Sequence, residues 1–272
     1  MTTTIAPAPT VERQRSFLRL VAHQSGSDLR CFWRNTQSRF FTLALPVLFL
    51  VIFGSVFAGQ NVKVPGGRIA ESVYYVPGII VFGLVSAAFM NLTLAVVRCR
   101  ESGMYKRRRA TPVPAGVIIA GRAVVGVLTA VVIAALLLII GWAAYGASIP
   151  IRTAPALILD VIVGSAVFCC LGFALASIIN TVDAAQPAVQ AIVLPLNFIS
   201  GVFIPVASLP HWLVDAGTLF PVRPLAAALL AAYNPHTTGS GIRWGDLAIL
   251  AAWGAAGLVV AIRRFSWLPR GN

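Results

Sequence analysis

The sequence predicts an all-α integral membrane protein with six transmembrane helices, an N-terminal interfacial amphipathic helix and short helices in the last outer loop. Of its 272 residues, 58% are hydrophobic and only 11% are charged, whereas soluble domains carry about 25% charged residues. Several apolar runs come close to the roughly 20 residues that a helix needs to cross a bilayer. Basic residues gather beside these runs, as they do at the cytoplasmic face of membrane proteins.

The first residues, 1–10, form a tail rich in Thr, Pro and Ala that we expect to be disordered. This tail does not read as a secretory signal, because no apolar stretch directly follows a short basic region. Residues 11–37 form an amphipathic segment, with apolar side chains such as Leu18, Val21 and Phe32 on one face and arginines on the rest. We interpret it as a cytoplasmic helix in the membrane plane; the alternative is a solvated helix packed on another domain.

Residues 38–264 are expected to form the six-helix membrane domain, and residues 265–272 a cytoplasmic tail. A half-apolar stretch, 209–233, contains three prolines. Because proline breaks helices, we expect short helices at the outer interface here rather than a seventh span. The expected spans are 40–58, 73–97, 123–147, 154–179, 184–206 and 247–262.

The distribution of Lys and Arg predicts the orientation in the membrane. Six precede the first span, seven lie between the second and third, and three follow the sixth, against five on the opposite side. By the positive-inside rule both termini are cytoplasmic. The net charge of +13 then needs no nucleic-acid partner, although basic proteins often have one. One connection, 180–183, is cytoplasmic in this topology yet has no basic residue.

The sequence lacks the motifs of an enzyme. It contains no G-x4-G-K-[ST] phosphate-binding loop, and neither of its two lysines, Lys63 and Lys106, follows a glycine-rich turn. The three histidines are far apart, and the four cysteines have no zinc-site or disulfide spacing. We therefore predict no catalytic residue, no metal and no cofactor bound by this chain.

The loop after the second span, residues 98–114, joins a dense basic block to two prolines. A plain positive-inside anchor would explain the basic block. The alternative is a docking helix that contacts a cytoplasmic partner. Glu101 favours the docking helix, because an acidic residue adds nothing to orientation. We expect Glu101 to pair with a neighbouring basic residue and to fix the angle of this helix.

Three short motifs follow at the end of the fifth span and in the loop after it. They are S-G-x-x-x-P from Ser200, L-P-x-W-L from Leu209 and P-x-x-P-L from Pro221. Together with the E-x-G of Glu101–Gly103 and the Thr-Pro-Val-Pro-Ala-Gly segment from Thr111, this ordered set resembles the ABC-2 type permeases. In particular, it is similar to drug and polyketide-antibiotic exporters of the daunorubicin-resistance type.

The resemblance extends over nearly the whole chain but departs from the family pattern at two places. Lys106 to Arg109 stand where the family has apolar residues, and Pro114 stands where a hydroxyl residue is common. Both departures lie in the loop that carries the expected docking helix, so they bear on its contacts with a partner.

The resemblance implies a bacterial half-transporter. A permease in the plasma (inner) membrane would pair with a second permease, identical or paralogous, among membrane lipids. A separate ATP-binding cassette subunit would bind ATP-Mg and drive efflux of an amphipathic substrate such as a drug, an antibiotic, or a lipid or glycan precursor. The residues implied in coupling are Arg100, Glu101, Gly103, Met104, Arg107, Arg108 and Pro112. Those implied in the outer loop are Pro205, Pro210, Trp212 and Pro221.

Polar side chains inside the spans are candidates for a substrate path. Gln186, Gln190 and Asn197 lie within about 40° of one helical face at 100° per residue. Amides are costly in lipid, so they should face protein or water. They would either form hydrogen bonds between helices or line the path. Our path candidates are Asn91, Gln190, Asn197 and Ser200.

A carboxylate inside the fourth span, Asp160, would be a functional-site candidate if buried. It lies about one and a half turns from the outer end of that span. We therefore expect it to reach the interface or to pair with Arg152.

Two other functional classes remain open. An ion-coupled carrier would need inverted repeats and several intramembrane carboxylates, and the sequence offers neither. A non-transporting membrane assembly factor would need no motor subunit. An adjacent gene for an ATP-binding subunit would favour the exporter.

Overall fold

A computed structural model describes residues 17–34, 36–104, 115–147 and 149–264. The expected tails, 1–10 and 265–272, therefore lie outside the described residues. In chain order the elements are α1 (Phe17–Arg34), α2 (Thr36–Val56), β1 (Asn61–Val64), β2 (Gly67–Ala70), α3 (Glu71–Leu84), the π-helical η1 (Val85–Asn91), α4 (Leu92–Glu101), α6 (Ala115–Tyr145), α7 (Ala154–Ile178), α8 (Val182–Ile199), the 3-10 turn η2 (Val206–Ser208), α9 (His211–Thr218), α10 (Val222–Tyr233) and α11 (Trp244–Arg264).

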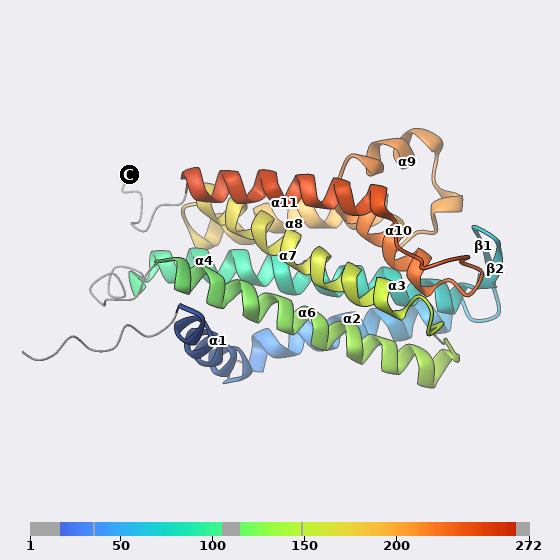
Figure 1. The fold of residues 1–272 in the computed structure, drawn as a ribbon, viewed down its shortest axis with the longest axis horizontal. Coiled ribbons are helices and arrows are strands. Elements are labelled where there is room, and N and C mark those ends of the chain that lie inside the picture. The colour runs from blue at the N-terminus through green and yellow to red at the C-terminus, as the bar shows by residue number, and fades with distance from the viewer. Residues whose placement is uncertain (1–16, 35, 105–114, 148, 265–272) are drawn as a thin grey trace, which may run out of the picture.

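The long helices lie side by side along the long axis of the molecule (Figure 1). Helix α1 and the last turns of α4 and α11 lie at one end, which we call the α1 end. The β1–β2 hairpin and α9 lie toward the opposite end, which we call the hairpin end. The end of α4 and the start of α6 are therefore grouped with α1, far from the hairpin.

Helix α7 is the centre of the packing, with α4, α6, α10 and α11 around it. Its approach to α11 is close because glycines of α11 face it. A Cβ added at Gly254 would lie 3.0 Å from Cγ2 of Val167, and one added at Gly257 would lie 3.1 Å from the backbone carbonyl carbon of Cys170. Small residues let helices in membranes pack backbone to backbone, so these glycines set the α7–α11 spacing.

The structure confirms an all-α, multi-pass membrane protein. Among the described residues, five helices are long and apolar enough to cross a membrane, or six if the pair α9 and α10, which meet at 97°, is one span. The apolar stretch of α2 found in the described residues, Thr42–Val56, is shorter. The count of six spans therefore stays a prediction, as does the position of α9 and α10 at the outer interface.

Two helix ends differ from the bounds of the predicted spans. Helix α6 begins at Ala115, well before 123, because Arg122 lies inside the helix with partners of its own. The fifth span does not reach 206, because α8 ends at Ile199. Two residues later Gly201 has a φ of 82°, the left-handed conformation with which glycine commonly ends a helix.

The β1–β2 hairpin was not among the predicted elements. Its strands are antiparallel, with Val64 opposite Gly67, and Gly66 in the turn has a φ of 89°. Residues along β1 alternate between exposed and buried. A period of two beside a Pro-Gly turn is the signal of a hairpin, and it is visible in the sequence from Asn61 onward.

Candidate coupling site

The end of α4 explains the spacing of the E-x-G motif. Glu101 is the last residue of the helix, and Ser102 caps it with its N–H donating to the carbonyl of Arg98 at 3.0 Å. Gly103 follows with a φ of 68°, and its N–H donates to the carbonyl of Arg100 at 3.1 Å. A left-handed residue one position past the cap favours glycine, so the motif fixes where α4 stops.

Arg100, just before the end of α4, caps a different helix. Its side chain is only 2% exposed. Nη1 donates to the carbonyl of Ala176 at 3.0 Å, and Nη2 donates to the carbonyl of Ile179. The last four carbonyls of a helix have no partner within it, and the C-terminal end of the helix dipole attracts cations. Arg100 therefore satisfies the C-terminus of α7.

Glu101 contacts the N-terminus of α8. Its Oε2 accepts a hydrogen bond from the backbone N–H of Val182, the first residue of α8, at an N···O distance of 2.9 Å. Thr181 is the N-cap of α8, and its Oγ1 accepts from the N–H of Ala184. The first N–H groups of a helix lack partners within it, and its positive end favours a carboxylate.

Arg100 and Glu101 thus bind the two sides of one turn, residues 179–181, which joins α7 to α8. We call this arrangement the Arg100–Glu101 clamp. The cation binds the carbonyl end of α7 and the anion binds the amide end of α8, so each charge matches the helix terminus it contacts. Glu101 was expected to pair with a neighbouring basic residue. The partner found among the described residues is the backbone of Val182; Lys106 to Arg109 lie outside them, so the expected pairing stays a prediction.

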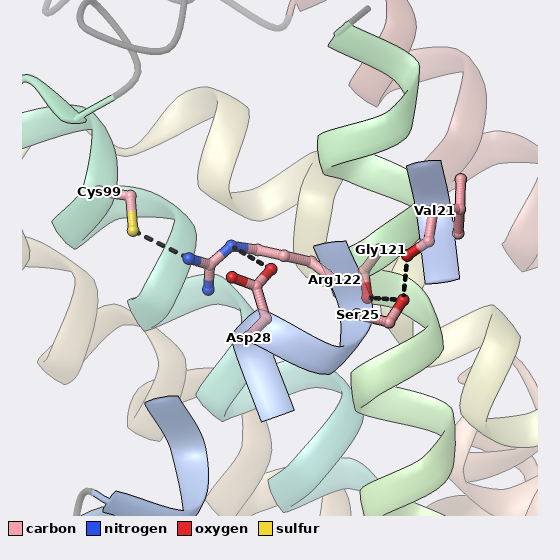
Figure 2. A network of polar contacts seen from close by, with 6 residues as sticks. All are labelled: Val21, Ser25, Asp28, Cys99, Gly121 and Arg122. Atoms are coloured by element: carbon pink, nitrogen blue, oxygen red, sulfur yellow. Dashed lines mark hydrogen bonds and ion pairs between the residues drawn. The ribbon is translucent and has the colours of Figure 1, made fainter. Parts of the chain in front are cut away.

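A second set of polar contacts ties α1 to α6 and α4, and Figure 2 shows it. Arg122 of α6 lies between α1 and α4: its Nε is 3.9 Å from Oδ2 of Asp28, and its Nη2 donates to Sγ of Cys99 at 3.0 Å. On α1, Ser25 Oγ donates to the carbonyl of Val21 at 2.8 Å and lies 3.3 Å from the carbonyl oxygen of Gly121. Because Cys99 directly precedes Arg100, the α1 contacts adjoin the clamp.

The approach of α1 to α6 is close at Gly121. A Cβ added there would lie 2.7 Å from Cγ of Gln24 and 3.5 Å from the backbone nitrogen of Ser25. A glycine at this position therefore lets α1 lie against α6, with Arg122 extending beside it (Figure 2).

The profile of the ABC-2 type transporter family matches residues 26–233. The chain belongs to the ABC-2 type transporter family. No curated protein matches it in a search. The matched region includes α4, the clamp and the α7–α8 turn. ABC-2 membrane domains are transporter permeases without an ATP-binding site of their own, and they normally pair with an ATP-binding subunit.

The remaining coupling residues of this ABC-2 permease are described only in part. Gly103 is half-buried and Met104 is exposed at the point where the described part of the loop ends. Arg107, Arg108 and Pro112 lie outside the described residues. The assignment of these residues to a motor contact stays a prediction.

The four path candidates of the permease do not share one environment. Asn91 ends η1 and its Nδ2 donates to Oγ1 of Thr42 on α2 at 2.7 Å. Gln190 is exposed, whereas Asn197 and Ser200 are buried. Nδ2 of Asn197 donates to the carbonyl of Val193 on its own helix. Of the amides expected on one face of the fifth span, Gln190 thus lies at the surface and Asn197 in the interior of the chain. The role of the path candidates stays a prediction.

The expectation for Asp160 of the permease is wrong. Its side chain is completely buried, and neither carboxylate oxygen has a hydrogen-bond partner among the described residues. Arg152, the expected partner, donates to the carbonyl of Thr237 instead. Asp160 lies on α7, around which α10 and α11 pack, so it cannot extend along lipid to the interface.

The outer-loop prolines of the permease each mark the start of an element. Pro205 precedes η2, Pro210 precedes α9 and Pro221 precedes α10, each in the N-cap position. Proline suits helix starts because it has no N–H to leave unpaired. Trp212 on α9 is 70% exposed; its position at a membrane interface stays a prediction.

Proposed function

We propose that this chain is the membrane-spanning permease subunit of an ATP-driven exporter, of the daunorubicin-resistance type. Its substrate is an amphipathic molecule, such as a drug, an antibiotic, or a lipid or glycan precursor. It acts in the bacterial plasma membrane as a six-span protein with both termini cytoplasmic. Two permeases, identical or paralogous, pair above two ATP-binding cassette subunits, which carry the ATP-Mg.

The observation that carries this proposal is the Arg100–Glu101 clamp. A permease without its own nucleotide site receives work through contact with its motor subunit, and loop 98–114 is the internal loop richest in charge. The clamp joins the start of that loop to the main chain on both sides of the α7–α8 turn. Arg100 donates to a carbonyl before the turn, and Glu101 accepts from the N–H of Val182 after it. A displacement of the loop by the motor is therefore passed to α7 and α8, and not to α4 alone.

The clamp also supports the proposed orientation. The connection 180–183 was the one cytoplasmic segment without a basic residue of its own. Arg100 supplies a positive charge at this connection from another part of the chain. A cation beside this connection is consistent with the proposed cytoplasmic position of the connection.

An ion-coupled carrier is the second candidate, and Asp160 is the observation that favours it. A buried carboxylate without a partner is typical of ion and proton pathways in membranes. Such pathways usually contain several carboxylates. Among the described residues no group of three or more His, Cys, Asp or Glu side chains lies together, so we prefer the exporter.

Purification of the tagged chain from its native membrane tests the proposal. We expect an ATP-binding cassette subunit to co-purify with it and to hydrolyse ATP faster when the permease is present. Recovery of the intact permease without any ATP-binding subunit, from membranes in which that subunit is expressed, would support the carrier or the assembly factor instead.

A further inference from the structure

A shallow apolar groove lies on the outside of the bundle, beside the point where α1 is followed by α2. Its volume is about 430 Å³. None of its lining residues belongs to the clamp or to the predicted substrate path. They come from α1, α2 and α6, and all but Thr36 are apolar: Trp33, Phe40, Leu43, Ala44, Val47 and Leu136.

The groove is about as long as one leaflet of a bilayer is thick. Its lining on α2 extends from Thr36 to Val47, a rise of about 16 Å at 1.5 Å per residue. The hydrocarbon core of a bilayer is about 30 Å thick, so one leaflet supplies about 15 Å of it. Helix α2 runs along the long axis from the α1 end (Figure 1), and Leu136 lies beyond the middle of α6. The groove therefore leads from the α1 end toward the centre of the membrane, and an acyl chain fits its length.

The walls of the groove are open to the surroundings of the chain. Phe40 is 62% exposed and Trp33 is 46% exposed, while Leu43 and Val47 are half-buried. A concave surface contacts an acyl chain on more sides than a flat helix face does, and each further pair of atoms in contact adds dispersion attraction. A chain in the groove is therefore held more firmly than the lipid around the rest of the bundle.

Two arginines lie beside the mouth of the groove. Arg30 and Arg34 are exposed on α1, at about 60° and 100° around the helix from Trp33, on the same side of it, at 100° per residue. Neither forms an ion pair among the described residues, where the two ion pairs are Asp28–Arg122 and Arg243–Asp246. No acidic residue lines the groove. Guanidinium groups bind phosphate oxygens through paired hydrogen bonds, and basic residues on an amphipathic helix attract anionic lipids.

We propose that this groove binds one anionic phospholipid. Its acyl chain lies along α2 from Trp33 to Leu136, and its phosphate pairs with Arg30 and Arg34. The lipid thereby joins the end of α1 to α2 and α6. This inference goes beyond the proposed function, since the lipid stays with the permease whichever molecule is exported. Only the assignment of the lipid to the cytoplasmic leaflet rests on the proposed topology.

Two lipids with the same chains and different headgroups test the inference directly. The full chain is purified in detergent, without a motor subunit, and titrated with dioleoylphosphatidylglycerol or dioleoylphosphatidylcholine while native mass spectrometry counts the bound lipids. We expect one phosphatidylglycerol to bind on the order of tenfold more tightly than phosphatidylcholine. Arg30→Gln combined with Arg34→Gln should abolish this preference. Arg19→Gln combined with Arg98→Gln removes the same charge from exposed positions outside the groove and should retain it.

The site of the acyl chain is tested separately. Val47→Trp fills the groove and should lower the affinity for phosphatidylglycerol several-fold. Val51→Trp is the matched control, because Val51 is 44% exposed one turn further along α2 and does not line the groove; it should bind the lipid like the wild type. If Val47→Trp fails to fold, Ala44→Phe fills the same groove. Phosphatidylglycerol with a photoreactive diazirine in its acyl chain should label the α2 peptide that contains Leu43 and Val47.

Equal affinities for the two lipids would overturn the inference. So would wild-type binding of phosphatidylglycerol in the folded double variant of Arg30 and Arg34, or in folded Val47→Trp. Loss of dimers in Val47→Trp with lipid binding unchanged would assign the groove to a second copy of the chain and would also overturn it. Because no motor subunit is present, the result is independent of whether an ATP-binding subunit co-purifies.

Discussion

The carboxylate of Glu101 and the backbone N–H of Val182 are joined across 81 residues of sequence by a hydrogen bond of 2.9 Å. The bond connects the end of α4 to the first residue of α8. Arg100 binds the other side of the same turn, so both residues connect the α7–α8 turn to the end of α4.

Replacing Arg100 should destabilise the protein. In Arg100→Met the carbonyls of Ala176 and Ile179 lose buried donors, and an unsatisfied buried group costs about 1–3 kcal/mol. We expect a lower melting temperature of the purified chain in detergent. Arg98→Met is the control, since Arg98 is exposed on the same helix, and it should melt like the wild type. Equal melting temperatures of the Arg100→Met and Arg98→Met proteins would show that the cap contributes nothing.

Replacing Arg122 should loosen α1. Arg122→Met removes the contact with Asp28 and the hydrogen bond to Cys99, while Ser25 still contacts the carbonyl of Gly121. Hydrogen exchange followed by mass spectrometry should then show faster exchange of the amides of α1, with little change in α7. Arg19→Met, which changes an exposed arginine of α1, should exchange at the wild-type rate. Unchanged protection of α1 in Arg122→Met would mean that the helix is held by its apolar face alone.

The orientation can be measured with single cysteines in a background without the four native ones. Ser102 and Ser240 are both exposed, and the proposed topology places them on opposite sides of the membrane. In whole cells an impermeant thiol reagent should label Ser240→Cys and not Ser102→Cys. In inside-out vesicles the pattern should reverse. Labelling of Ser102→Cys in intact cells would overturn the positive-inside assignment.

The sequence could predict the membrane class and the approximate position of most helices, because long apolar runs are local signals. It could not predict the end of α8 at Ile199, since the residues after it are still apolar and only the backbone of Gly201 ends the helix. The start of α6 was missed for the opposite reason: Arg122 suggests a loop until its partners on α1 and α4 are known.

The candidate site shows the same limit. Glu101 could be singled out from the sequence because an acidic residue is unusual in a basic loop. Its partner could not be predicted, because Val182 contributes only a backbone N–H and lies 81 residues away. Arg100 was counted among orienting charges, and no local pattern indicates that it is buried against the end of α7. Asp160 was misjudged because its depth in the span could be estimated but the helices around it could not.

The coupling ratio of Glu101 variants measures whether the clamp transmits work from the motor subunit to α8. Transport of substrate and hydrolysis of ATP are measured together for the permease reconstituted with its motor subunit. We predict that Glu101→Ala assembles at wild-type levels but hydrolyses ATP with little or no transport, because the loop no longer moves the start of α8. Glu101→Gln, which keeps an oxygen that can accept from Val182, should retain much of the coupling. A wild-type ratio of transport to hydrolysis in Glu101→Ala, at equal expression, would show that the clamp does not couple the motor subunit to α8.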